Sequence, residues 1–228
     1  MNRSELRTIV ATALCSVALL LPVGAHALSI ASDNQGWVND AGGGNGAADG
    51  NNTFTGNEFG NRYNSWANFD LSSVSGTVTS AKLEVFSSTF PGGNGPYTVS
   101  IYDVTTTLAS LAASTSGVAG YLDLGGGFLY AVDSFGDGTT VTVTLSAQAI
   151  ADINAAAGGT FRVGFTNDTL NAHNPATAAT EIYTNHNLPG HPILILETVP
   201  EPASLALLGL ALAGLGFGVF FVVFSAPL

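Results

Sequence analysis

The last part of the chain carries an apolar run that few soluble folds could accommodate. Residues 205–224 are twenty consecutive residues without a charge, drawn only from Leu, Val, Phe, Gly and Ala. As a helix this run is about 30 Å long, which matches the hydrocarbon core of a bilayer. The segment is therefore predicted to be a transmembrane helix.

A rigid acidic tripeptide, Pro200-Glu201-Pro202, stands just before this apolar run. Each proline lacks a backbone N–H donor and pushes the residue before it, Val199 or Glu201, towards an extended conformation. The tripeptide therefore cannot be an interior helical turn. It is predicted to lie extended at the membrane surface, where a processing enzyme can bind it.

Residues 198–228 together closely resemble the PEP-CTERM sorting signal of bacterial surface and matrix proteins. The resemblance implies a transient anchor in the inner membrane and cleavage at Pro200-Glu201-Pro202 by an exosortase-type membrane peptidase. It also implies delivery to the cell surface or the extracellular space. Signals of this family usually finish with an Arg-rich cluster, whereas residues 218–228 contain no base. A plain C-terminal anchor is the alternative interpretation.

The N-terminus has the pattern of a secretory signal peptide. Arg3 and Arg7 precede an apolar run at residues 9–23, and Ala25 and Ala27 form an A-x-A cleavage site for signal peptidase. We therefore expect residues 1–27 to direct export and to be removed, so that a single domain occupies residues 28–197.

Charge and cysteine content exclude several classes of function. Five Lys and Arg stand against 16 Asp and Glu, for a net charge of -11, so the surface should repel nucleic acid. The single cysteine, Cys15, lies in the predicted signal peptide, which leaves the mature domain without disulfides or thiol chemistry. Neither a G-x-S-x-G elbow nor an H-E-x-x-H motif is present, so we expect no enzyme activity.

Period-two alternation of apolar residues dominates the chain after Trp66 and predicts an all-β, antiparallel β-sandwich. Residues 28–65 form a Gly- and Asn-rich N-terminal part of the domain. Within it, residues 32–65 are expected to be loops, with one strand around 36–38. Ser146 is expected to cap one short helix at 147–157, which ends at Gly158. Strands are expected at 67–71, 78–87, 97–104, 128–132, 141–145, 161–165, 182–183 and 193–196.

Residues 68–83 read Asn-Phe-Asp-Leu-Ser-Ser-Val-Ser-Gly-Thr-Val-Thr-Ser-Ala-Lys-Leu. This run is similar to one found in extracellular β-sandwich modules, including jelly-roll domains of the carbohydrate-binding kind. Residues 97–104 and 149–159 fit the same pattern. The resemblance implies a jelly-roll-like sandwich for the middle of the chain.

Two groups of polar residues could hold a metal ion. Asp133 and Asp137 flank a Gly-containing turn and could bind a structural calcium ion, although a tight hairpin turn explains the same residues. No other cofactor is expected. A zinc site could draw on clustered histidines and two acids, although polar loop histidines are the simpler explanation. The residues concerned are His173, His186, His191, Glu181 and Asp168.

Aromatic residues offer a possible polysaccharide site. Trp37 and Trp66, with Tyr63, Tyr121 and Tyr130, could stack on sugar rings, although aromatic residues are also ordinary core material. Acids are spread singly along the chain, so the sequence selects no carboxylate pair for glycoside hydrolysis.

The two targeting signals favour a non-enzymatic exported protein of the cell surface or of a biofilm or exopolysaccharide matrix. The alternative from another class is a carbohydrate-binding module that recognises matrix polysaccharide.

Overall fold

The computed structural model describes residues 26–46, 52–58, 60–89, 96–136, 138–171, 180–185 and 191–199. Residues 27–198 form one compact unit. The strands are β1 (His26–Ala31), β2 (Asn34–Asn39), β3 (Gly44–Asn45), β4 (Asn52–Glu58), β5 (Asn61–Asp70), β6 (Thr77–Thr89), β7 (Tyr97–Asp103), β8 (Leu129–Phe135), β9 (Thr139–Thr144), β10 (Thr160–Asn167), β11 (Thr180–Asn185) and β12 (Ile193–Val199). The helices are α2 (Leu108–Ala112), α3 (Gly117–Leu124), α4 (Ala147–Ala155) and α5 (Asp168–Asn171).

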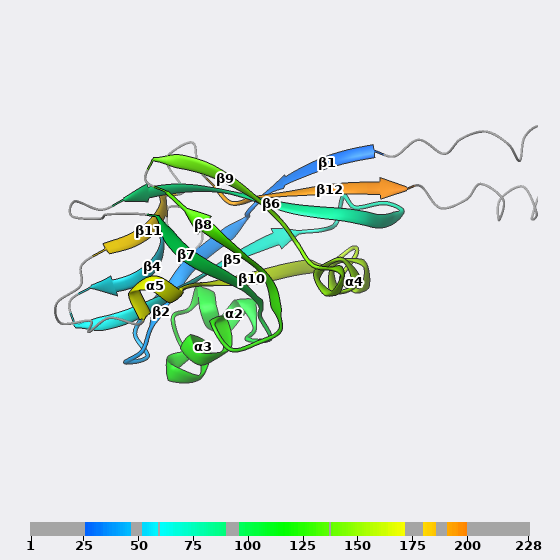
Figure 1. The fold of residues 1–228 in the computed structure, drawn as a ribbon. Coiled ribbons are helices and arrows are strands. Elements are labelled where there is room, and N and C mark those ends of the chain that lie inside the picture. Colours follow the sequence, from blue (N-terminus) through cyan, green and yellow to red (C-terminus); the bar gives the residue numbers. More distant parts are fainter. Residues whose placement is uncertain are drawn as a thin grey trace, which may run out of the picture. The chain divides into compact units, whose positions relative to one another are not determined.

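The strands form one continuous sheet that folds over into two layers (Figure 1). Its order is β1-β12-β6-β11-β4-β5-β10-β7-β8, with β9 added to β6 and β2 added to β5. β11 links the layers, because it pairs antiparallel with β4 along its length and with β6 at Ile182 and Tyr183. The predicted mainly-β, antiparallel, sandwich-like architecture is confirmed, and the jelly-roll assignment stays a prediction.

The main hydrophobic core lies between the two layers. In one layer, the register of β10 and β5 places Phe161 opposite Phe69 and Val163 opposite Ala67, and all four side chains are buried. Successive side chains of a strand point to opposite faces of the sheet, so every second residue of β5 and of β10 points into this core. The other layer contributes buried apolar side chains from β6, β9 and β12: Ala81, Leu83, Val85, Val143, Leu194 and Leu196.

The predicted helix after Ser146 is confirmed as α4. The Ser146 Oγ accepts a hydrogen bond from the Ala149 backbone N at 3.4 Å, as an N-cap residue should. Asn154 then fixes the helix to β6, since its Oδ1 accepts from the Val78 N at 2.8 Å and its Nδ2 donates to the Val78 O at 2.9 Å.

The strand expected around 36–38 is confirmed as β2. The expectation that the rest of residues 32–65 is loop is wrong, because β3, β4 and the first part of β5 lie there. The polar residues of β4 are buried inside the fold rather than solvated, as Thr53, Thr55 and Asn57 show. Thr55 and Ser65 share a hydrogen bond between their hydroxyls, and Asn57 Nδ2 donates to the Leu170 carbonyl. Hydrogen bonding lowers the cost of burying such groups, so a polar strand can be stable here.

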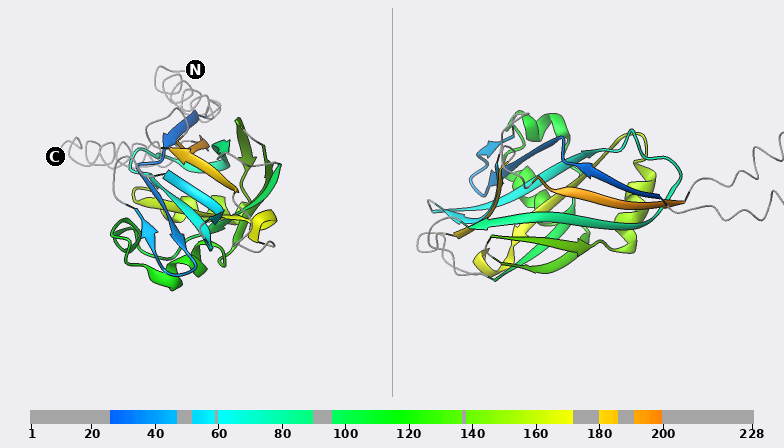
Figure 2. Two further views of the ribbon diagram at one scale, coloured as in Figure 1. Left: turned by 90° about the vertical axis from the view of Figure 1, so that its left-hand side faces the viewer. Right: turned by 90° about the horizontal axis from the view of Figure 1, so that it is seen from above.

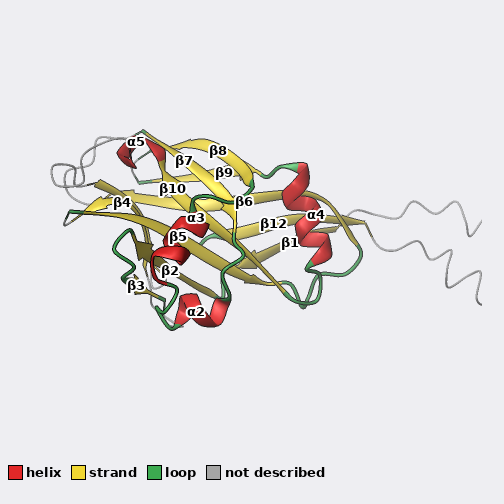
Figure 3. Ribbon diagram, turned by 90° about the horizontal axis from the view of Figure 1, so that it is seen from below, coloured by secondary structure: helices red, strands yellow, loops and turns green. Residues whose placement is uncertain are grey.

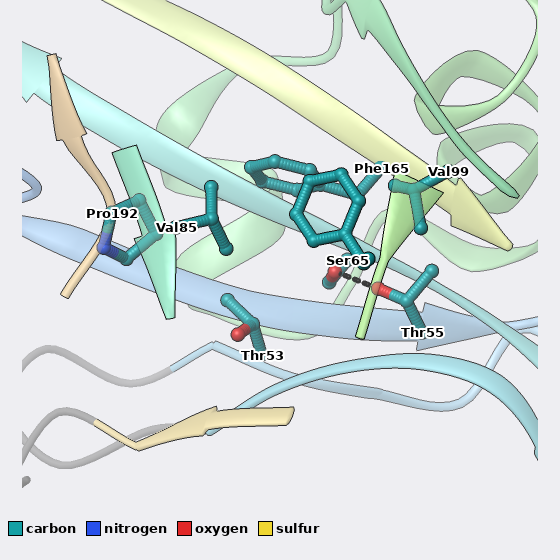
Figure 4. Close-up of a pocket in the computed structure, with 8 residues that line it drawn as sticks. Thr53, Thr55, Ser65, Val85, Val99, Phe165 and Pro192 are labelled. Atoms are coloured by element: carbon teal, nitrogen blue, oxygen red, sulfur yellow. Dashed lines mark hydrogen bonds between the residues drawn. The ribbon is translucent and has the colours of Figure 1, made fainter. Parts of the chain in front are cut away.

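A small cavity lies beside these hydroxyls (Figure 4). Its volume is about 10 Å³, and Thr53, Thr55 and Ser65 share its lining with apolar side chains such as Val85 and Phe165. This is near the lower limit for one water molecule. The cavity is therefore a packing feature and not a ligand site.

The expectation of a single helix is also wrong, because residues 104–128 fold into α2 and α3 over the outer face of the sheet (Figure 3). Thr107 starts α2, since its side chain accepts from the Ser110 N at 3.3 Å. The two helices bury a second apolar cluster against β2 and β5, formed by Val38, Trp66, Leu111 and Leu124. This added layer covers Val38 of β2 and Trp66 of β5 on the outer face of the sheet.

Candidate functional site

The C-terminal strand leads directly into the predicted sorting tripeptide. In β12, Leu194 and Leu196 are fully buried and Thr198 is nearly so. The Glu197 carbonyl also accepts a hydrogen bond from the Thr79 Oγ1 at 3.3 Å. Val199 is the last strand residue, so Pro200 follows the sandwich with no linker between them.

The first and last strands lie side by side in the sheet. The start of β1 and the end of β12 lie at the same end of the domain in Figure 1 and in the right-hand view of Figure 2. Ala27, predicted to precede the signal-peptidase cut, is the second residue of β1. The two predicted processing points therefore flank one edge of the domain.

Most residues of the two targeting signals lie outside the described part of the chain. This applies to Ala25, to Pro200, Glu201 and Pro202, and to the apolar run at 205–224. Among the residues that are described, no helix is long and apolar enough to cross a membrane. The signal peptide and the transmembrane helix therefore stay predictions.

The two tryptophans predicted to bind sugar occupy different environments. Trp66 is fully buried beneath α2 and α3, so it has no free face and is corrected to a core residue. Trp37 is half-buried and meets Tyr63 edge-on, with the ring centroids 5.1 Å apart. Phe54 completes this cluster, 4.7 Å from Tyr63 and 6.2 Å from Trp37. Trp37 therefore remains a candidate, although its ring already packs against two others.

Two of the tyrosines predicted to stack on sugar, Tyr130 and Tyr121, also occupy different environments. Tyr130 is a core residue that stacks on Phe161 and donates a 2.6 Å hydrogen bond to the Asp152 Oδ2; burial, and then this bond, raise the Tyr130 pKa. Tyr121 on α3 is only half-buried. Burial and the nearby Asp40 carboxylate raise the pKa of Tyr121, and the phenol therefore stays a hydrogen-bond donor at neutral pH.

The predicted metal residues are not brought together in the described part of the chain. Asp133 is exposed on β8, where its Oδ1 accepts from the Ser134 N at 2.7 Å. The hairpin expected here is wrong, because β8 pairs with β7 and β9 pairs with β6. No group of three His, Cys, Asp or Glu in the described ranges could hold a metal ion. Asp137, His173 and His186 lie outside those ranges, as does the Glu181 side chain.

A surface hollow that no sequence pattern predicted lies beside α3. It has a volume of about 220 Å³ and lies between α3 and the outer face of β5, β10 and β7. Its lining comes from four separate stretches of the chain: Asn64, Tyr102, Tyr121, Leu122, Gly125, Thr166 and Asp168. No motif joins these residues, because the folding of 104–128 onto the sheet is what assembles them.

The tail matches a known family model. Residues 198–223 match the PEP-CTERM protein-sorting motif, which confirms the resemblance of the tail; the match does not extend to the sandwich. No curated protein matches the chain. The matched segment starts at Thr198 in β12, so the last strand and the sorting motif overlap. The chain is therefore an exported protein that carries a PEP-CTERM sorting motif, is processed by an exosortase at the membrane and goes to the cell surface.

Proposed function

We propose that this chain is a non-enzymatic surface or extracellular-matrix protein, released from a transient membrane anchor by cleavage at Pro200-Glu201-Pro202. The observation that carries the proposal is the overlap between the sorting motif and the last core strand. In this proposal the sandwich is the domain that is delivered, and the tail is the signal that directs its sorting.

The spacing between the domain and the predicted membrane helix supports this mechanism. Only residues 200–204 separate Val199 from the apolar run at 205–224. Five extended residues span at most about 18 Å. With residues 205–224 in the membrane, as proposed, the tripeptide would be within reach of a peptidase embedded in the same membrane.

The composition of the domain suits a structural role outside the cell. The core between the two layers needs no cysteine, and the net charge of -11 keeps the surface acidic and soluble. Attachment to a biofilm or exopolysaccharide matrix is part of the proposal.

Carbohydrate binding is the second candidate function. Of the two tryptophans predicted for it, only Trp37 retains partial exposure, within the Phe54 and Tyr63 cluster. Binding to polysaccharide that is lost on Trp37→Ala would support this function at that cluster.

The matched pair Glu201→Gln and Glu197→Gln tests cleavage at the tripeptide. Glu201 lies in the proposed cleavage motif, whereas Glu197 is an exposed acid of β12 four residues earlier. In a host with the sorting peptidase, we expect the Glu201 variant to accumulate uncut on an immunoblot and the Glu197 variant to be processed like wild type. Equal processing of both variants would show that the sorting peptidase does not recognise Glu201 of the tripeptide.

A further inference from the structure

The hollow beside α3 has two aromatic walls. Tyr102 comes from β7 and Tyr121 from α3, and both are half-buried. No aromatic ring contact within the described residues involves either of them, unlike Trp37, Phe54 and Tyr63, which pack on one another. Leu122, which is 61% exposed, adds an apolar side chain at the rim.

The polar lining of the hollow is arranged to accept hydrogen bonds. Asp168 is exposed, and two hydroxyls hold its carboxylate in place: Thr166 Oγ1 donates to Oδ1 at 3.0 Å and Ser100 Oγ donates to Oδ2 at 2.5 Å. Each carboxylate oxygen can accept more than one hydrogen bond, so both keep capacity for a ligand. The carboxylate is therefore fixed before any ligand arrives.

Asn64 lies at the base of the hollow and ties α3 to the sheet. The residue is 3% exposed, and its Nδ2 donates to the Tyr121 carbonyl oxygen at 3.0 Å. This hydrogen bond joins β5 to α3, so it helps to hold Tyr121 in place beside the hollow.

We propose that this hollow is a saccharide-binding site that takes one sugar ring of a polysaccharide. A pyranose has an apolar face of C–H groups, which suits the tyrosine rings, and a rim of hydroxyl donors, which suits the exposed carboxylate of Asp168. Aromatic walls with a few placed polar groups are typical of small-molecule sites. This inference is independent of the sorting of the tail, because all of its residues lie in the sandwich.

The size and surroundings of the hollow favour one unit of a polymer. Its volume of about 220 Å³ is below the range of roughly 300–1,000 Å³ for drug-sized ligands. Beyond it, the exposed residues Leu129 and Val132 of β8 stand opposite Tyr102 and Ser100 of β7. The open face thus continues along β8, with room for the neighbouring sugar units.

Affinity electrophoresis of the full-length chain, purified in a non-ionic detergent, tests the proposal. The gels would contain dextran, cellulose derivatives, chitosan or alginate. We expect at least one neutral polysaccharide to retard the wild type, and Tyr102→Ala to weaken that binding by about tenfold. Asp168→Asn, which keeps the shape of the side chain, should weaken binding by a similar factor. The melting temperature of each variant, measured by circular dichroism, checks that the fold is intact.

Asp70→Asn is the matched control for Asp168→Asn, because it changes an exposed carboxylate that does not line the hollow. The proposal predicts unchanged retardation for this variant. Loss of binding on Trp37→Ala with Tyr102→Ala unaffected would place the site at the other aromatic cluster. Retardation by chitosan alone that disappears at high salt would identify a cation site instead. Failure of every polysaccharide to retard the wild type would overturn the proposal and would leave the sorting of the tail untouched.

Discussion

At the scale of single residues, Asp123 holds the segment between β7 and α2. Its carboxylate accepts four hydrogen bonds at 2.6–3.0 Å, from the backbone N and the hydroxyl of both Thr105 and Thr106. Burial is the largest single influence and opposes ionisation, but the four bonds together outweigh it and lower the pKa of Asp123. The folded state therefore favours the ionised carboxylate.

This lowered pKa predicts a pH-dependent effect of Asp123→Asn. The Asp123 carboxylate has a lower pKa in the folded state than in the unfolded state, where the pKa of Asp is about 3.9. Its ionised form therefore stabilises the fold at pH values above about 3.9, and this stabilisation is lost as the pH falls through the folded-state pKa. We expect the variant to lose about 1 kcal/mol at pH 7, since the group is partly exposed. The difference from wild type should shrink steadily below pH ~4. Urea unfolding across this pH range measures it.

Asp133→Asn is the matched control for this prediction. Asp133 is exposed and accepts one hydrogen bond, from its neighbour Ser134. The control should change stability little at any pH. A loss for Asp123→Asn that is the same at pH 7 and pH 3 would contradict the role given to its charge.

At the scale of elements, the docking of α3 depends on a glycine in the sheet. A Cβ added to Gly164 of β10 would lie 2.3 Å from the Leu124 carbonyl oxygen at the end of α3. Because that atom belongs to the backbone, the helix would have to move. Close approach of α3 to β10 also sets the walls of the hollow, since Tyr121 and Leu122 lie on that helix.

Gly164→Ala is therefore expected to lower the free energy of unfolding by about 2–3 kcal/mol, as overpacked sites do. It should also increase amide hydrogen exchange in α3. Gly136→Ala is the control, since the nearest atom to its added Cβ would be the Thr139 Oγ1 at 3.5 Å, an ordinary contact. Unchanged protection of α3 in the Gly164 variant would show that the helix is not held by this close approach.

Regular apolar spacing made some elements predictable. Strands β6 and β7 could be predicted because apolar residues alternate along each of them. Helix α4 could be predicted because Ser146 is a typical N-cap residue. β4 was not readable, since it buries Thr and Asn that depend on partners in β5 and α5. Neither α2, with 5 residues, nor α3, with 8, is long enough to show a clear helical period.

The sorting tail and the hollow beside α3 also differ in how well the sequence alone predicts them. The sorting tail is one continuous segment with its own composition, so the sequence alone identified it. Trp66 looked like a sugar-stacking residue because no pattern showed that α2 and α3 would cover it. The hollow draws Asn64, Tyr102, Tyr121 and Asp168 from four elements, so only the fold brings them together.

At the scale of the whole molecule, the fold places both ends of the domain at one edge. β1 and β12 are neighbours in the sheet, and the sorting motif begins inside β12. Once the signal peptide is removed, the tail is the only predicted attachment to the membrane. A single cut beyond Val199 would then free the sandwich and keep every core residue of its described part, including Leu194 and Leu196 of β12.

Intact mass spectrometry of the protein from cells with and without the exosortase shows whether the tail is cut and where. In cells that have the enzyme, we expect a chain that starts at Leu28 and ends within Pro200-Glu201-Pro202, recovered from the cell surface or the medium. In cells that lack it, the chain should extend to Leu228 and stay with the membrane. Recovery of the chain ending at Leu228 from the membranes of exosortase-containing cells, with no shorter form at the surface, would contradict the account.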